Sequence, residues 1–169
     1  MGNVLGAAAL AVSDLLLAGV TGASGISASG AAALIVLRAS PGLSVTELGR
    51  RIGLSQPAAA RMVDSLEARD LVERQRGAGK EVAVRATEGG LNTAYRILSA
   101  RGGRLAGLVA KLDESERETL DRLLGKLLTG AYEEVRSSER LCRLCDRAAC
   151  VADGWDCPVG AAERAQLAG

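Results

Sequence analysis

The side chains best suited to chemistry in this 169-residue chain are four cysteines near its C-terminal end. Cys142, Cys145, Cys150 and Cys157 have the spacing C-x2-C-x4-C-x6-C, and Pro158 follows the last of them. Thiolates are soft ligands, and four of them surround the tetrahedral zinc ion of many structural sites. The chain has no histidine, so no imidazole can complete such a site. The segment therefore predicts a metal-binding module.

The cysteine spacing leaves three chemistries open. It is similar to a zinc knuckle in which cysteine replaces histidine, which favours zinc. A cysteine followed by proline also ends the runs that hold a [4Fe–4S] cluster, although the intermediate spacings differ here. Cys142 and Cys145 alone have the C-x-x-C spacing of a redox pair, so a thiol switch is the third possibility. The neighbouring Arg140, Arg143 and Arg147 would favour it by lowering the pKa values of the thiols. We expect Cys142 and Cys145 to share a face at the end of a helix.

Composition restricts the class of protein. Apolar residues make up 48% of the chain, charged residues 24%, and the net charge is +1, as in soluble globular proteins. The missing histidine removes the commonest catalytic base, so we expect no enzyme. All but three of the 21 basic residues are arginine, which makes bidentate contacts with phosphate and guanine. The composition thus permits nucleic-acid binding, and we expect a cytoplasmic protein.

An apolar stretch, Val4 to Val20, opens the chain. It lacks the basic start of a signal peptide, and Asp14 interrupts it, which also disfavours a membrane span. We expect a core or dimerisation helix that a second copy of the chain buries. Thr21 to Gly30 is rich in Gly and Ser and predicts a flexible connector.

Two helices separated by a glycine turn are predicted in the middle of the chain. Ser44 to Glu47 is an S-x-x-E capping box that begins a helix ending at about Ile52. Gly53 lies where the chain must turn, because glycine adopts positive φ without steric cost. A second helix then runs from about Gln56 to Arg69. This pair predicts a helix-turn-helix.

The second helix has an apolar face and a face suited to DNA. Gln56 and Arg61 are the expected base readers, since Gln pairs with adenine and Arg with guanine in the major groove. Ser55 and the helix N-terminus suit a phosphate, and Pro57 fits the first helical turn. The opposite face is predicted to be buried and carries Ala59, Met62, Val63 and Leu66.

Two alternating segments, LVERQR and EVAVRA, predict a β-hairpin after the second helix. Its tip is Gly77 to Lys80, and the nearby cations are Arg74, Arg76, Lys80 and Arg85. Small residues and cations at a hairpin tip suit a minor groove or a phosphate backbone. The order of elements is that of a winged helix-turn-helix. The alternative is a protein-interaction module with the same elements and no affinity for nucleic acid.

The segment LSVTELGRRIGLSQPAAARMVDSLEARDLVER resembles the MarR family of bacterial transcription regulators, most specifically from Leu54 to Arg74. RATEGG, Arg85 to Gly90, is similar to the junction that follows the wing in that family. The resemblance covers roughly Val4 to Glu134. It implies a mainly α fold with a small β-hairpin wing, and an obligate homodimer on a near-palindromic operator.

The resemblance also implies roles for single residues. It places Ser55, Gln56, Pro57 and Arg61 at the DNA groove, and Arg76 and Lys80 on the wing. The wing departs from the family pattern, with Ala78 where an Asp is usual and Lys80 where an Arg is usual. A repressor is favoured, and a small-molecule or redox effector is a further candidate partner.

We expect two long helices after the wing, one capped by Thr87 and a second beginning near Asp113. Together, these predictions divide the chain into five parts. The parts are an N-terminal dimerisation helix and connector (1–33), the winged helix-turn-helix lobe (34–90), long dimerisation helices (91–140), the four-cysteine module (141–160) and a tail (161–169).

Overall fold

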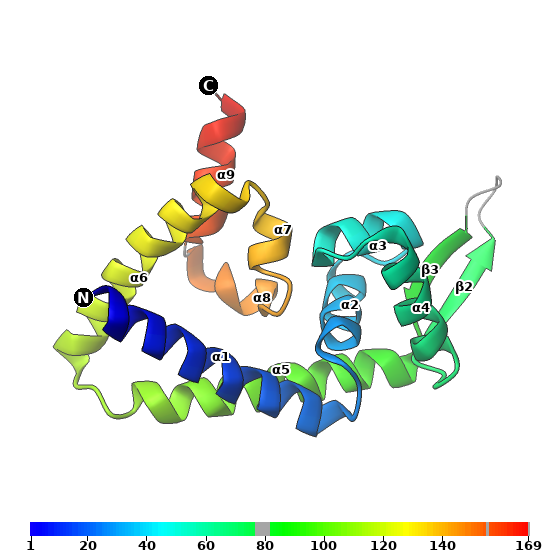
Figure 1. Ribbon diagram of the computed structural model, residues 1–169, viewed down its shortest axis with the longest axis horizontal. Coiled ribbons are helices and arrows are strands. Elements are labelled where there is room, and N and C mark those ends of the chain that lie inside the picture. The colour runs from blue at the N-terminus through cyan, green and yellow to red at the C-terminus, as the bar shows by residue number, and fades with distance from the viewer. Residues whose placement is uncertain (77–81, 155, 169) are drawn as a thin grey trace.

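The fold is mainly helical with one small antiparallel sheet (Figure 1). A computed structural model describes residues 1–76, 82–154 and 156–168. The helices are α1 (Gly2–Ser24), α2 (Ala28–Ala39), α3 (Val45–Ile52), α4 (Gln56–Glu67), α5 (Glu88–Val109), α6 (Glu114–Val135), α7 (Ser138–Leu141), α8 (Arg147–Cys150) and α9 (Pro158–Ala168). The strands are β1 (Leu43–Ser44), β2 (Val72–Arg76) and β3 (Val82–Ala86), in the sheet order β1-β3-β2. The predicted winged helix-turn-helix architecture is confirmed.

Three groups of elements share the molecule. Helices α1 and α5 pack side by side and form the long base seen in Figure 1. At one end of α5, helices α2, α3 and α4 and the sheet form the reading lobe. At the other end α6 departs, and α9 packs against it. Helices α7 and α8 lie between α6 and the reading lobe, so the cysteine segment bridges the two groups.

Helix α2 is the centre of the core. It is apolar almost all round, and its residues 31–35 and 37 are buried, with Leu34 and Leu37 almost inaccessible to solvent. The side chains of Leu48, Leu66 and Ile97 close over it from α3, α4 and α5. Because three helices share one buried partner, the lobe behaves as a packed unit rather than as separate helices.

Local sequence signals set the helix starts. The Ser44 hydroxyl accepts a hydrogen bond from the Glu47 N–H at 3.1 Å, as the capping box predicts. Within the described residues, the Glu47 carboxylate accepts from Arg50 and Arg51 rather than from the Ser44 N–H. The Thr87 hydroxyl caps α5 through the Gly90 N–H at 3.0 Å, which confirms the predicted start of that helix.

The predicted connector from Thr21 to Gly30 is largely helical, which corrects the sequence interpretation. Helix α1 continues to Ser24, and the hydroxyls of Thr21 and Ser24 donate to carbonyl oxygens one turn earlier. Gly25 ends the helix with φ of 66°, and Ser27 caps α2. The true connection is therefore only three residues long.

The C-terminal end also differs from the prediction. Cys142 and Cys145 are not on the long helix, because α6 ends at Val135 and Arg136 adopts a left-handed conformation with φ of 51°. The chain then reverses into α7, and Cys142 follows its last residue. Residues 161–168 of the predicted tail belong to the helix α9, which begins at Pro158 and buries Val159. Proline at a helix start followed by good helix formers was the overlooked signal.

Helix α1 is apolar and largely exposed. By length and composition alone it could cross a membrane, a test that the buried core helix of a soluble protein and an N-terminal signal sequence also pass. Its Gly19 and Val20 are buried, and it packs along α5. Asp14 lies within the helix, where a membrane would disfavour a charge.

Candidate functional site

The predicted reading face of α4 is exposed. Ser55, Gln56, Pro57 and Arg61 all lie on the surface, whereas the four predicted core residues of the same helix are buried. Ser55 occupies the N-cap position, but its side chain makes no capping hydrogen bond. Its hydroxyl and the first N–H groups of α4 are therefore free to meet a phosphate.

The two helices of the helix-turn-helix approach each other at Gly49. A Cβ on Gly49 would lie 2.7 Å from the Cβ of Ala59. The crossing of α3 and α4 therefore leaves no room for a side chain at position 49. Gly53 makes the turn with φ of 78°, as predicted. The turn glycine was predicted from the sequence, whereas Gly49 was not, because no local pattern indicates a close crossing between two helices.

The wing strands pair as the alternating pattern predicts. Arg74 pairs with Val84 and Arg76 with Val82 in antiparallel register. Arg76 is exposed, as a DNA contact requires. The predicted hairpin tip, including Lys80, lies outside the described residues. Thus only the base of the wing is placed beside α4.

Arg74 lies in a different environment from Arg76. Its guanidinium donates hydrogen bonds to Asp64, at 2.6 Å, and to Glu67. Both carboxylates are on α4. The hydrogen bond that Arg74 donates to Asp64, together with the nearby Glu67 carboxylate, raises the pKa of Arg74. Its side chain therefore ties the wing to the reading helix, and a DNA contact by Arg74 would have to compete with two carboxylates.

The four cysteines gather around one surface pocket. Cys142 follows α7, Cys145 lies in the next turn, Cys150 ends α8 and Cys157 immediately precedes α9. All four are half-buried free thiols. All four line a pocket of about 340 Å³, together with side chains of α7, α8 and α9. Segments up to 15 residues apart are thus brought together, as the metal prediction requires.

The pKa values of the thiols in the cysteine pocket are shifted in different directions. A hydrogen bond from Cys142, aided by Arg101, Arg147 and Arg143, lowers the pKa of Cys145 to about 6, although burial opposes this. Nη2 of Arg101 lies 3.8 Å from the Cys145 sulfur. The hydrogen bond that Cys142 makes to Cys145, together with burial, raises the pKa of Cys142. Burial and the neighbouring Cys157 raise the pKa of Cys150 to about 11.

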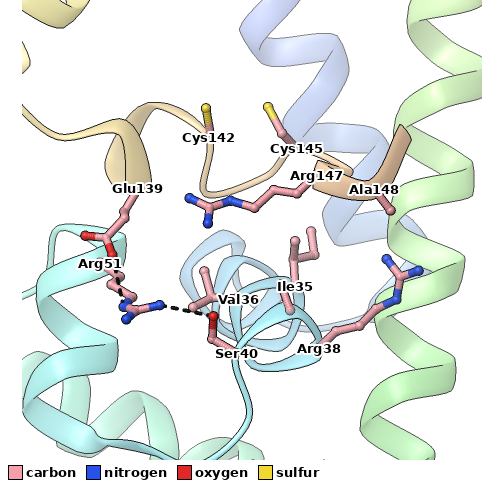
Figure 2. Close-up of a pocket in the computed structure, with 11 residues that line it drawn as sticks. Ile35, Val36, Arg38, Ser40, Arg51, Glu139, Cys142, Cys145, Arg147 and Ala148 are labelled. Atoms are coloured by element: carbon pink, nitrogen blue, oxygen red, sulfur yellow. Dashed lines mark hydrogen bonds and ion pairs between the residues drawn. The ribbon is translucent and has the colours of Figure 1, made fainter. Parts of the chain in front are cut away.

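Figure 2 shows the sulfur atoms of Cys142 and Cys145 directed the same way, away from Ile35 and Val36 of α2. On the opposite side of the cysteine turn lies a second cavity of about 200 Å³. Its wall includes Arg38 and Arg51 of the reading lobe as well as the two cysteines. The cysteine module and the reading lobe therefore face each other across this cavity.

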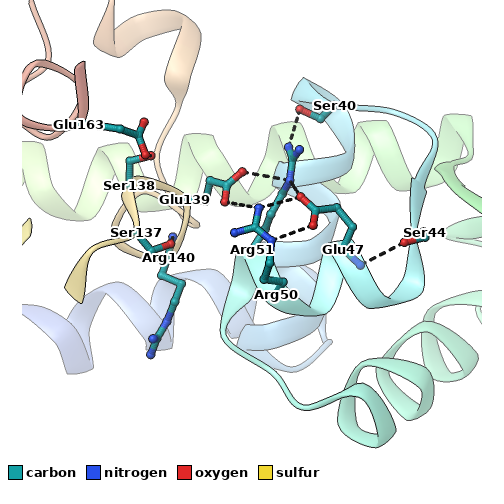
Figure 3. A network of polar contacts seen from close by, with 10 residues as sticks. All are labelled: Ser40, Ser44, Glu47, Arg50, Arg51, Ser137, Ser138, Glu139, Arg140 and Glu163. Atoms are coloured by element: carbon teal, nitrogen blue, oxygen red, sulfur yellow. Dashed lines mark hydrogen bonds and ion pairs between the residues drawn. The ribbon is translucent and has the colours of Figure 1, made fainter. Parts of the chain in front are cut away.

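A network of ion pairs joins α7, the helix that precedes the first cysteine, to α3 (Figure 3). Glu139 contacts Arg50 at 2.7 Å and Arg51 at 3.1 Å, using both carboxylate oxygens. Arg51 also binds Glu47 at 2.8 Å and the Ser40 hydroxyl at 3.2 Å. The hydrogen bonds from Arg50 and Arg51 lower the pKa of Glu47 to about 2.

Glu139 and its two arginine partners were not among the residues predicted from the sequence. The spacing of Glu47, Arg50 and Arg51 is that of pairs on one helix face, which was a usable signal. The partner Glu139 lies 89 residues from Arg50, and no local pattern connects them.

Comparisons with known proteins support this architecture. Residues 24–81 match the model of the MarR family. No curated protein sequence matches the chain. Among solved structures, MepR from Staphylococcus aureus, a transcription regulator of the multidrug efflux pump MepA, is 18% identical with a TM-score of 0.70, over 78% of this chain and 98% of that chain.

Two further structures are similar at higher sequence identity. Wild-type apo MarR from E. coli is 25% identical with a TM-score of 0.63, over 76% of this chain and 96% of that one. The transcriptional repressor CouR, bound to a 23-mer DNA duplex, is 26% identical with a TM-score of 0.61, over 75% and 91%. The chain therefore has a winged helix-turn-helix fold like that of the MarR family.

Proposed function

We propose that this protein is a sequence-specific, DNA-binding transcription regulator. The observation that carries the proposal is the exposed row of Ser55, Gln56 and Arg61 on α4, next to the exposed Arg76 of the wing. A helix with free N–H groups and two base-reading side chains fits a major groove. The related repressor CouR was solved on a DNA duplex, which favours a repressor here and a cytoplasmic location.

A homodimer on a near-palindromic operator completes the proposal. Helix α1 exposes Val4 at 75% and Leu10 at 70%. Helix α6 exposes a leucine stripe of Leu123, Leu124, Leu127 and Leu128. Two long apolar faces on one small chain are more than single chains usually leave to solvent. A second copy of the chain would cover both and place two α4 helices about 34 Å apart, one turn of DNA.

Binding to duplexes enriched from a randomised pool tests the proposal. We expect duplex affinity to fall steeply between about 50 and 200 mM salt, because basic side chains that neutralise DNA phosphates release bound counterions. Arg61→Ala should reduce discrimination between enriched and scrambled duplexes by roughly tenfold or more, because a guanine contact is lost. Arg96→Ala, on the exposed surface of α5, is the matched control and should leave discrimination unchanged.

The same experiment separates the alternative of a protein-interaction module. Such a module would show no salt-dependent duplex binding by the wild-type protein. If binding occurs but Arg61→Ala leaves discrimination intact, a face other than α4 reads the sequence. An effector is a further proposed partner, and the cavity beside Arg38 and Arg51 is where we would seek one.

We also propose that Cys142, Cys145, Cys150 and Cys157 hold a metal ion, with zinc favoured and a [4Fe–4S] cluster as the alternative. The four thiols line one pocket, and arginines beside it would offset the negative charge of a metal tetrathiolate. In the described part of the chain, no three His, Cys, Asp or Glu side chains already have the geometry of an ion site. Binding therefore requires the four thiol side chains to rearrange around the ion.

Anaerobic purification followed by elemental analysis and a visible spectrum tests the metal proposal. One zinc per chain without colour supports a structural zinc site. Iron with visible absorbance supports the cluster. Neither metal nor colour, with four titratable thiols, would overturn both and leave the thiol switch.

A further inference from the structure

Helices α6, α7 and α9 form an arm that leaves the base of the molecule at the end of α5 (Figure 1). At the turn between α5 and α6, Nε of Arg117 donates to the Val109 carbonyl oxygen at 3.3 Å. Among the described residues, α6 packs mainly against α9 and α7 rather than against α1 or α5, and α7 packs against α3 of the reading lobe. Because a short turn constrains the angle between two helices weakly, we expect the contact of α7 with α3 to set the angle between the arm and the lobe.

The chain around α7, residues 138–146, lies against the reading lobe. Leu144 packs on the apolar core of the lobe. Nε of Arg140 lies 3.0 Å from where a Cβ on Gly53 would stand, at the turn between α3 and α4. The segment therefore contacts both the core of the lobe and the turn that precedes the reading helix.

Glu139 of α7 makes ion pairs with two arginines of α3. Its two carboxylate oxygens contact Arg50 at 2.7 Å and Arg51 at 3.1 Å. The side chains of Glu139 and Arg51 are 22% and 21% exposed, so solvent screens their attraction less than that of a surface pair. Arg51 is itself held by Glu47 and by the Ser40 hydroxyl. Because the arginines bind different oxygens of one carboxylate, the network fixes the direction of α7 on α3 as well as its distance.

The arm behind Glu139 is packed together. The hydroxyl of the buried Ser138 donates to Glu163 of α9 at 2.6 Å. Helix α9 packs along α6 and also contacts α7. The orientation that Glu139 gives to α7 therefore extends to α6, which carries the exposed leucine stripe proposed as the dimer contact.

We propose that Glu139 is a positioning residue that sets the half-site spacing that the dimer recognises. The inference rests on the proposed function, a homodimer on a near-palindromic operator, and deepens it by naming a determinant of operator choice. Because the proposed dimer contact lies on α6, the angle between the arm and the lobe fixes the separation of the two α4 helices. One base pair more or less between the half-sites moves one of them by about 3.4 Å and turns it by about a tenth of a helical turn. A lobe held by Glu139 cannot follow that displacement, so the DNA deforms or one half-site is released.

The dependence of affinity on half-site spacing tests this role. Full-length protein is titrated with the duplex enriched from a randomised pool, and with duplexes in which a base pair is added or removed at its centre. For the wild type we expect the altered spacing to weaken binding by about tenfold or more, since both lobes no longer engage undeformed DNA. Glu139→Gln removes the charge and keeps the size of the side chain, and this spacing penalty should shrink by at least about threefold. A residue that merely stabilised the fold would lower affinity at every spacing and leave the penalty unchanged.

Two further variants complete the experiment. Glu134→Gln, at an exposed glutamate of α6, is the matched control and should keep the wild-type penalty. Arg50→Gln breaks the same contact from α3 and should reduce the penalty in the same direction. Its side chain is 57% exposed, so we expect the fold to tolerate this change, and it decides the outcome if thermal unfolding shows that Glu139→Gln is unfolded.

An unchanged penalty in both Glu139→Gln and Arg50→Gln would overturn the positioning role, as would a wild type indifferent to half-site spacing. Failure of the proposed function is seen separately, before any variant is made. Absent duplex binding or a monomeric wild type would overturn the dimeric regulator, and the positioning role with it.

Discussion

Gly90 lies so close to Leu71 that a Cβ on Gly90 would stand 2.0 Å from the Leu71 carbonyl oxygen. The contact joins the first turn of α5 to the chain entering β2, and the Thr87 N–H donates to the same carbonyl at 3.1 Å. The wing and the long helix are thus docked backbone to backbone. This explains why glycine, and no larger residue, follows Gly89 in the RATEGG segment.

Gly90→Ala should therefore destabilise the protein. The methyl group meets a backbone atom that cannot rotate away, and overpacking of this kind costs about 1–3 kcal/mol or more. We expect a lower melting temperature at fixed protein concentration. Gly89→Ala is the matched control: its Cβ would lie 3.6 Å from the nearest atom, and alanine is the better helix former. Equal stability of the two variants would contradict the close contact.

The crossing of α3 and α4 gives a second prediction. Gly49→Ala would place two Cβ atoms 2.7 Å apart, so the helices must separate or rotate. We expect a loss of about 1–3 kcal/mol in the free energy of unfolding and weaker duplex binding, because the reading helix is displaced. In Gly102→Ala the new Cβ meets no atom within 4 Å, and that variant should retain stability and duplex binding.

The lowered pKa of Glu47 predicts an acid-dependent contribution to stability. Its pKa falls from 4.5 to about 2 through hydrogen bonds from Arg50 and Arg51. A carboxyl whose folded pKa lies below its unfolded value stabilises the fold above about pH 4.5, and that contribution is lost as pH falls towards 2. The side chain is 32% exposed, so the effect is modest, about 1 kcal/mol or less.

Urea unfolding of wild type and Glu47→Gln between pH 6 and pH 2.5 tests this. The wild type should be the more stable protein at pH 6, and the difference should shrink steadily on acidification. Glu134→Gln should follow the wild type at every pH. A wild-type advantage that grows at low pH would contradict the sign.

The sequence predicted the reading lobe well because its signals are local. Capping hydroxyls at Ser44 and Thr87, the glycine turn at Gly53 and the two faces of α4 each depend on residues within a few positions. The apolar face of α4 specifies its own burial by periodicity, and its exposed face then defines the candidate reading residues.

The remainder depends on contacts between distant segments. No local sequence pattern indicates such contacts. Examples are the ion pair of Glu139 with Arg51, the approach of Gly90 to Leu71 and the ion pair of Arg74 with Asp64. The cysteine positions were also misjudged, because Arg136 reverses the chain with a left-handed conformation that arginine rarely adopts. The cysteines could be recognised from type and spacing, but their position between α6 and α3 could not.

Exposure of α6 gives the last prediction, which concerns assembly. Leu127 is 49% exposed within the leucine stripe of a helix that an α1–α6 interface would cover. Leu127→Asp places a charge in that interface, and burying an unpaired charge costs several kcal/mol. We expect the dimer to dissociate at micromolar concentration in sedimentation velocity, and duplex affinity to fall because two half-sites are no longer bound together. Leu167→Asp, at a site 83% exposed near the end of α9, should leave the sedimentation of the protein unchanged. If both variants remain dimers, the leucine stripe of α6 is not the contact between the two copies.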